Sequence, residues 1–276
     1  MTVEQRSQGD SAPISERMAG TTAYTIAGKG PPVVLIHGVG LRREIWAPQT
    51  SALLNDFTVI AYDTLGHGLS ATPPVTVTLA DYANQLESLL DHLDVARAAV
   101  VGHSMGALIA LEFALTRPDR VQGVAALNAV FCRTPEQSAV VQGRAALIAL
   151  EGVEATLGEI LTRWFRDAPT PVAQSTVAWV SGMLRNVDPV GYQRAYQLFA
   201  LSDRAHEHRL GQLSVPALFM TGAFDPNSNV AMSRTMAGLA SRARIEILPD
   251  ARHMMTVTHA PRVNEVLKDF LISFAT

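Results

Sequence analysis

Short apolar runs separated by amphipathic segments are the main pattern along the chain. Several runs are almost continuously apolar, which is typical of strands buried on both faces of a sheet. Most of the segments between them repeat apolar residues at the helical period. We predict strands over 22–26, 33–37, 58–62, 98–102, 121–127, 217–221 and 244–248, and helices over 79–93, 105–117, 231–239 and 263–274. This alternation predicts a mainly parallel α/β sheet.

The alternation stops between Phe131 and Leu213, where helical patterns continue without a convincing strand. We interpret this stretch as a helical cap, or lid, inserted over the edge of the sheet where strands end and open α/β sheets bind ligands. The alternative is that these helices merely cover the sheet. The predicted organisation is a flexible leader over 1–20, a core over 21–130 and 214–276, and a cap over 131–213.

Composition and charge exclude several classes of protein. The 276 residues are 48% hydrophobic and 17% charged, and 22 basic against 25 acidic residues give a formal net charge of −3. This balance gives no electrostatic reason to expect a nucleic-acid partner. No apolar run approaches the roughly 20 residues of a membrane span, and the polar N-terminus lacks the apolar core of a secretory signal. The single cysteine, Cys132, indicates a reducing interior, so we expect a soluble, cytoplasmic protein.

The sharpest local signal is the G-x-S-x-G sequence of residues 102–106, between a predicted strand and a predicted helix. A serine in such a sharp turn adopts a strained backbone, and the two glycines prevent clashes with neighbouring chains. The Ser104 hydroxyl then stands at a helix N-terminus, where free N–H groups favour developing negative charge. Ser104 is therefore the candidate nucleophile.

Serine needs a base to remove its proton and an acid to orient that base. Among eight histidines, His253 follows a predicted strand and precedes the final helix, so it is the candidate base. Asp225 follows another predicted strand and is the candidate acid; Asp250 is the runner-up. Asn128 follows the strand over 121–127, where a rival acid could stand, but it carries no charge. The chain order nucleophile, acid, base is that of α/β-hydrolases.

Two backbone N–H groups are expected to bind the oxyanion of the reaction. One belongs to Met105, just after the nucleophile, and the other to Val39 in the glycine-containing loop 37–40. His37 is expected to anchor that loop. The loop does not begin a dinucleotide-binding G-x-G-x-x-G motif, because Arg43 stands at the third glycine position. We therefore expect no nucleotide cofactor and no metal.

With these residues assembled, the chain resembles the α/β-hydrolase superfamily over about residues 22–274. The resemblance rests on His-Gly at 37–38, D-T-L-G-H-G-L-S at 63–70, the motif at 102–106, G-A-F-D-P at 222–226, and His253. It implies an eight-stranded, mainly parallel sheet flanked by helices with an inserted helical cap, and a bracing role for Asp63 and His67. Within the superfamily the chain is similar to small lidded members such as 3-oxoadipate enol-lactonase-like esterases and ring-product hydrolases.

We expect a serine hydrolase that cleaves a small carboxylic ester or enol-lactone, with water as the second substrate, through an acyl-enzyme on Ser104. One alternative is a C–C bond hydrolase of a ring-cleavage product, a vinylogous diketone. Such enzymes often carry asparagine where this chain has His103, which makes this alternative less favoured. The other alternative is a non-catalytic ligand-binding protein of the same fold.

Candidate substrate contacts come from the predicted cap and from the loop after the strand 33–37. An arginine buried over the nucleophile would clamp a substrate carboxylate with two hydrogen bonds, and Arg42 or Arg43 could do the same. Most cap arginines are expected on exposed helix faces. Trp164, Trp179 and Met183 are candidates for the substrate wall, although a place in the core of the cap is the simpler interpretation.

Overall fold

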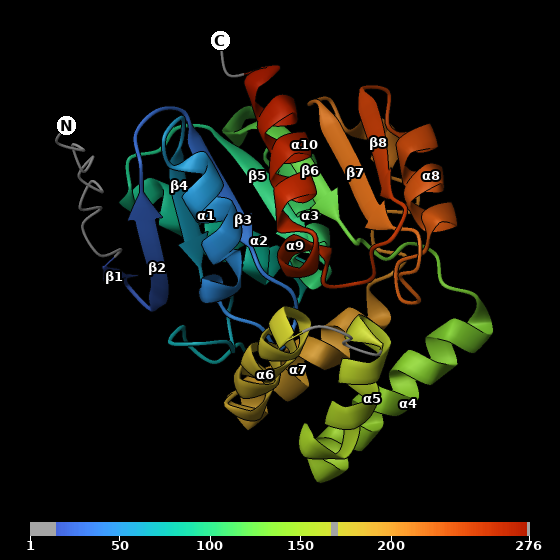
Figure 1. The fold of residues 1–276 in the computed structure, drawn as a ribbon. Helices are drawn as coiled ribbons and strands as arrows, with labels where there is room; N and C mark the ends of the chain where they lie inside the picture. The colour runs from blue at the N-terminus through green and yellow to red at the C-terminus, as the bar shows by residue number, and fades with distance from the viewer. Residues whose placement is uncertain (1–14, 167–170, 275–276) are drawn as a thin grey trace, which may run out of the picture.

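An eight-stranded sheet forms the centre of the protein in the computed structural model, which describes residues 15–166 and 171–274 (Figure 1). The strands are β1 (Glu16–Ala19), β2 (Thr22–Ala27), β3 (Pro32–Ile36), β4 (Thr58–Tyr62), β5 (Ala98–His103), β6 (Val121–Leu127), β7 (Ala217–Gly222) and β8 (Ala243–Leu248). They lie in the order β1-β2-β4-β3-β5-β6-β7-β8. The pairs β1/β2 and β2/β4 are antiparallel, and all others are parallel. The predicted mainly parallel sheet is confirmed.

Helices cover both faces of this sheet, as Figure 1 shows, with α1 and α10 in front and α2 and α3 behind. The helices of this layer are α1 (Ala47–Leu53), α2 (Leu79–His92), α3 (Met105–Thr116), α8 (Val230–Leu239), α9 (Met255–Thr258) and α10 (Ala260–Ile272), with the short 3-10 turns η1 (Arg43–Trp46), η2 (Pro118–Arg120) and η3 (Leu210–Gln212). The central strand β5 and helix α3 are buried almost throughout, because both faces of β5 pack against helices. The nucleophile motif therefore stands between two elements that are buried almost throughout.

The prediction of a flexible leader over 1–20 is wrong for residues 16–19. They form β1, which pairs antiparallel with β2 from Glu16 opposite Thr25 to Ala19 opposite Thr22. The strand is mostly exposed, so its sequence carries no alternating apolar pattern that would reveal it. Gly20, with φ +56°, turns the chain between the two strands. The rest of the predicted leader, residues 1–14, lies outside the described residues.

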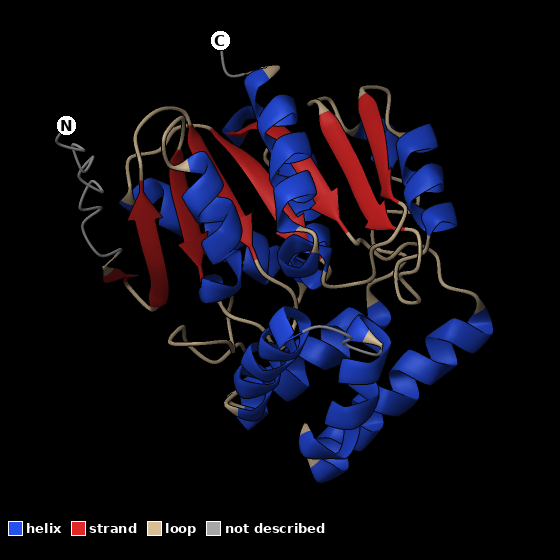
Figure 2. Ribbon diagram, in the orientation of Figure 1, coloured by secondary structure: helices blue, strands red, loops and turns tan. Residues whose placement is uncertain are grey.

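Four helices lie between β6 and β7 in the chain, below the carboxyl ends of the parallel strands (Figure 2). They are α4 (Pro135–Glu151), α5 (Glu154–Phe165), α6 (Pro171–Arg185) and α7 (Pro189–Leu201), and we call them the cap helices. Thr134 and Gln137 form a capping box at the start of α4, and the Asp188 carboxylate caps α7. The position of these helices agrees with a cap over the sheet edge; the domain boundaries at 131 and 213 stay a prediction.

A buried charge cluster ties the segment after α7 to the core. Glu112 on α3 accepts hydrogen bonds from Nε2 of His206 at 3.0 Å and from Nη1 of Arg209 at 2.8 Å. These contacts hold the chain beside the sheet as it returns from the cap helices to β7.

Within the described ranges, no helix combines the length and the apolar content needed to cross a membrane.

Candidate active site

Ser104 stands at the sharp turn from β5 to α3. Its backbone has φ 56° and ψ −116°, which is rare and strained for a residue with a side chain. A Cβ atom at Gly106 would overlap the backbone oxygen of Ile36, and one at Gly102 would overlap the oxygen of Gly106. The strained turn expected from the G-x-S-x-G motif is therefore present, and both glycines are sterically required. The N–H of Ser104 donates to the carbonyl of Leu127 at 2.8 Å and holds the turn against β6.

Three side chains from separate loops form one hydrogen-bonded row. Nε2 of His253 lies 3.1 Å from Oγ of Ser104, and Nδ1 of His253 lies 2.8 Å from Oδ2 of Asp225. Asp225 comes from the loop after β7 and His253 from the loop after β8. All three residues are buried. The spacing is that of a nucleophile, a base and a group that orients the base.

The Asp225 carboxylate is held by two further donors. Nδ2 of Asn128 lies 2.8 Å from Oδ2, and the N–H of Asn227 lies 2.8 Å from Oδ1. Burial by itself raises the pKa of Asp225, but His253 and the hydrogen bonds more than offset burial, so that the pKa lies below its usual value. Asp225 is therefore ionised and can stabilise a protonated imidazole. The runner-up acid, Asp250, is exposed, whereas Asp225 contacts the histidine directly.

His103, the second residue of the motif, contacts His253 in a way that our sequence interpretation missed. Its Nε2–H donates to the backbone carbonyl of His253 at 2.8 Å, and the two ring centroids are 5.0 Å apart. Burial lowers the pKa of His103 to about 3, so the ring is neutral. His103 thus holds the backbone of His253 in place. The only sign of this contact in the sequence is the histidine between Gly102 and Ser104, at a position where the motif allows any residue.

Two neutral histidines form hydrogen bonds with the backbone of the loop that contains Val39. Nδ1–H of His37 donates to the carbonyl of Gly38 at 2.8 Å, and Nε2 of His67 accepts from the N–H of Gly40 at 2.9 Å. Burial lowers the pKa of His37 to about 4 and that of His67 to about 3. These contacts are those expected of residues that anchor and brace the loop.

Val39 and Met105, the predicted oxyanion donors, lie in the loop after β3 and at the start of α3, and their role stays a prediction. Val39 lines the same cavity as Ser104, and Met105 is the first residue of α3. Among the described residues, no hydrogen bond engages the backbone N–H of either one. In the described part of the chain, neither N–H group is therefore engaged by a hydrogen bond that would compete with an oxyanion.

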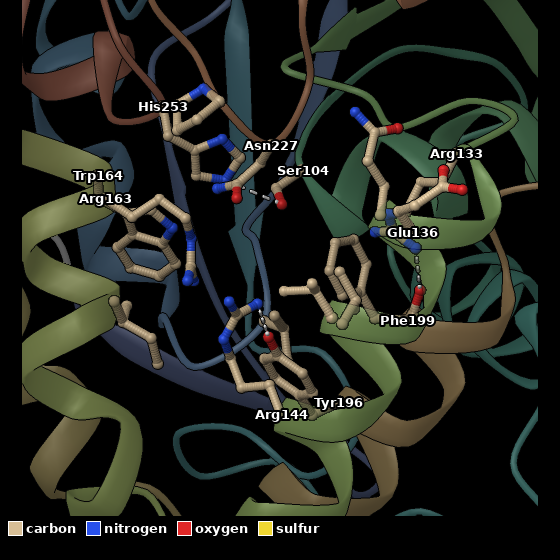
Figure 3. A pocket seen from close by; sticks show the side chains of 16 residues that line it. Ser104, Arg133, Glu136, Arg144, Arg163, Trp164, Tyr196, Phe199, Asn227 and His253 are labelled. Carbon is tan, nitrogen blue, oxygen red and sulfur yellow. Dashed lines mark hydrogen bonds between the residues drawn. The ribbon is translucent and has the colours of Figure 1, made fainter.

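A cavity of about 280 Å³ lies between Ser104 and the cap helices (Figure 3). Its apolar wall includes Val140, Val141, Ile160, Trp164, Tyr196 and Phe199. Three arginines of the predicted cap also line it: Arg133, Arg144 and Arg163. The cavity therefore combines an apolar wall with a concentrated positive charge, and its size suits a small molecule.

Of the five residues proposed as substrate contacts, Trp164 is the one that lines this cavity in the described part of the chain. Its ring centroid lies 5.5 Å from that of His253. Arg43 is buried elsewhere, and its guanidinium pairs with Asp63, which follows β4, and with Glu16 on β1. The remaining three lie outside the cavity lining: Arg42 pairs with Glu44, Met183 is buried among the cap helices, and Trp179 is exposed on α6.

The site as described contains no cluster of three His, Cys, Asp or Glu side chains, here or elsewhere in residues 15–166 and 171–274, that could hold a metal ion. The geometry of Ser104, His253 and Asp225 can support nucleophilic attack with proton transfer, using side chains alone.

Comparisons with known proteins show which family the chain is similar to. The family model described as alpha/beta hydrolase fold matches residues 31–260. The chain is 34% identical over 251 residues to (E)-2-((N-methylformamido)methylene)succinate hydrolase of Acinetobacter baylyi, covering 91% of this chain and 94% of that protein. It is 27% identical over 244 residues to 3-oxoadipate enol-lactonase 2 of the same species, covering 88% and 90%. The crystal structure of the enol-lactonase from Burkholderia xenovorans LB400 superposes with a TM-score of 0.85 at 29% identity, covering 94% of this chain and all of that one.

Proposed function

The chain belongs to the α/β-hydrolase fold family, and from this premise we propose that it is a serine hydrolase that cleaves a small carboxylic ester or enol-lactone through an acyl-enzyme on Ser104. The observation that carries the proposal is the hydrogen-bonded row of Ser104, His253 and Asp225 at the floor of the cavity. The row begins at the strained turn between β5 and α3, where the serine hydroxyl is presented to the cavity.

The first half of the reaction acylates the serine. Nε2 of His253 accepts the Ser104 proton as Oγ attacks the substrate carbonyl, and the resulting oxyanion accepts hydrogen bonds from the N–H groups of Val39 and Met105. When the tetrahedral intermediate collapses, His253 returns the proton to the departing oxygen. Asp225 remains ionised and stabilises the imidazolium that forms between these steps.

The second half releases the acid. A water molecule takes the place of the leaving group, His253 removes one of its protons, and the hydroxide attacks the acyl carbonyl. Collapse of the second tetrahedral intermediate breaks the acyl–Oγ bond, and His253 gives the proton back to Ser104. Each turnover thus consumes one water and needs no redox partner.

The choice of substrate class rests on the size of the cavity and on the relatives. The cavity of about 280 Å³ accepts a small acyl group. The enol-lactonases among the matches act on cyclic enol esters by name, and the succinate-derivative hydrolase also acts on a small acid by name. An ester or enol-lactone presents a carbonyl to Ser104 and an oxygen leaving group to His253.

We also propose a cytoplasmic location, because the single cysteine is unpaired.

The test compares the purified protein with its Ser104→Ala variant on short 4-nitrophenyl esters and on enol-lactones. The proposal predicts turnover by the parent protein and a loss of at least about 10³-fold in kcat for the variant, because the nucleophile is gone. Met18→Ala, on the exposed face of β1, is the matched control and keeps full activity. Turnover that Ser104→Ala leaves undiminished would contradict the proposal.

A further inference from the structure

The arginines that line the cavity differ in how their charges are compensated. Arg133 has its own acid: its guanidinium lies 3.5 Å from Oδ1 of Asp203, and its backbone N–H donates to Oδ2 of Asp203 at 2.8 Å. Its guanidinium also lies over the ring of Phe199, 4.7 Å from the centroid. Arg133 is thus a neutralised and fixed group that supports the start of α4.

Arg144 and Arg163 share a single acid. Nη2 of Arg144 and Nη1 of Arg163 donate to the same oxygen, Oε1 of Glu159, at 2.5 and 2.7 Å. The hydrogen bond from Arg144 holds the pKa of Glu159 below its usual value, so this acid carries a full negative charge. Two cations therefore face one anion, and one positive charge is left over.

The excess charge faces the cavity rather than the solvent. The side chains of Arg144 and Arg163 are 7% and 16% exposed, whereas that of Glu159 is 61% exposed. Figure 3 shows both side chains turned into the cavity, Arg163 beside Trp164 and Arg144 beside Tyr196, whose hydroxyl accepts a hydrogen bond from the Arg144 guanidinium. A further acid, Glu136, lines the cavity, but it is exposed to solvent and screened.

Donor groups in this region are also left without partners. Nε of Arg144 and Nε of Arg163 are buried, and neither makes a hydrogen bond within the described residues. Burying an N–H of a guanidinium without an acceptor is costly, and the cost is removed when an anion with two oxygens binds there. A carboxylate carries one negative charge and the flat two-oxygen edge that a guanidinium matches best.

We propose that Arg144 and Arg163 form a carboxylate-binding subsite, so that the natural substrate carries one carboxylate besides the carbonyl attacked by Ser104. The inference rests on the proposed function and narrows its substrate class. A single carboxylate balances the excess charge left by Glu159, and the apolar lining that includes Val140, Ile160 and Trp164 can pack against the carbon chain between the two groups.

Matched pairs of esters test this subsite. One pair is 4-nitrophenyl hydrogen glutarate and its methyl ester, which differ in a carboxylate on the acyl side. The other is 4-acetoxybenzoate and its methyl ester, which differ on the leaving-group side. We expect the anionic member of at least one pair to have a kcat/KM about 10- to 100-fold higher, chiefly through KM, as a charged hydrogen-bond pair provides.

The variants Arg144→Gln and Arg163→Gln should each reduce that preference at least about tenfold by raising KM for the anionic ester. Arg163→Lys, which keeps the charge and loses the fork, should fall between them and the parent protein. Arg185→Gln is the matched control, because Arg185 is a cap arginine that pairs with Glu154 outside the cavity. Should Arg144→Gln fail to fold, the less buried Arg163→Gln carries the test.

Equal kcat/KM for the acid and the methyl ester in both pairs, or a preference that survives both glutamine variants, overturns the subsite. The outcome is separable from the proposed function. If Ser104→Ala abolishes hydrolysis of all four esters and no preference is found, the subsite alone is wrong, whereas undiminished turnover by Ser104→Ala removes the function on which it rests.

Discussion

Replacing Asp225 by asparagine removes the negative charge behind His253 and leaves the shape of the site nearly unchanged. The carboxylate oxygen lies 2.8 Å from Nδ1 of the histidine, and the Asp225 side chain is fully buried. At that distance, two unit charges in an effective dielectric of about 20 attract by about 6 kcal/mol. Because each 1.36 kcal/mol of the barrier is worth a factor of ten, this corresponds to about a 10⁴-fold loss of kcat.

The loss has a second cause besides charge. An asparagine amide can present its NH₂ group to Nδ1, which favours the tautomer with its proton on Nε2, so that the histidine can no longer accept the Ser104 proton. We therefore expect a fall of about 10³- to 10⁴-fold in kcat for 4-nitrophenyl esters, measured after subtracting the rate of Ser104→Ala. The melting temperature should be recorded in parallel to confirm folding.

The neighbouring Asn128 allows a sharper version of the experiment. Its Nδ2 lies 2.8 Å from the same Asp225 oxygen that faces His253, and its backbone φ is +50°, which aspartate tolerates nearly as well as asparagine. In the double variant Asp225→Asn, Asn128→Asp, residue 128 carries the carboxylate and residue 225 the amide, so a negative charge is restored next to residue 225. We expect a recovery of about 10- to 100-fold over the single variant. If Asp225→Asn alone keeps more than a tenth of kcat, the assigned role of Asp225 is wrong.

Two further predictions concern stability. His37, His67 and His103 have pKa values lowered to about 4, 3 and 3 by burial, so the unfolded chain binds more protons than the folded one below about pH 6.5 and stability falls as pH falls. Between pH 7 and pH 5, each histidine should lower the free energy of unfolding by about 2 kcal/mol, or about 6 kcal/mol for the three together, as measured by urea unfolding. A total decrease of less than about 2 kcal/mol would contradict the neutral, buried state of these histidines. Gly106→Ala should lower the free energy of unfolding by more than about 3 kcal/mol because its Cβ meets the backbone of β3. Its control, Gly143→Ala, on the open face of α4, should be neutral or stabilising by about 0.5–1 kcal/mol, and equal effects of the two would refute the steric argument.

The fold followed from the sequence wherever strands are buried on both faces. The run that became β5 is apolar throughout, so its period and its place before a helix were unambiguous. The strand β1 was missed because it is an exposed edge strand, and α1 was missed because its short length and its proline give no helical period. In each case, contacts with distant segments decide the local structure.

The residues at the strand ends could be predicted because parallel topology brings carboxyl ends to one edge. Ser104, Asp225 and His253 lie together for that reason. The cap contacts could not be predicted in the same way. Which arginines face the cavity depends on how the cap helices pack, so the sequence supplied the idea of a cap arginine that clamps a carboxylate but named only Arg42 and Arg43, whereas Arg144 and Arg163 line the cavity. That Arg144 and Arg163 line the cavity is evident only from the packing of the cap helices in the structure.

The central claim, that Ser104 forms a covalent acyl intermediate, is tested most directly by mass spectrometry of the protein after reaction with a fluorophosphonate. The account predicts a single adduct of one probe per chain, located by peptide mapping on residues that include Ser104, and its loss in Ser104→Ala. It also predicts a strong slowing of labelling in Asp225→Asn. Folded parent protein that takes up no probe, or that carries the probe equally in Ser104→Ala, would contradict the account.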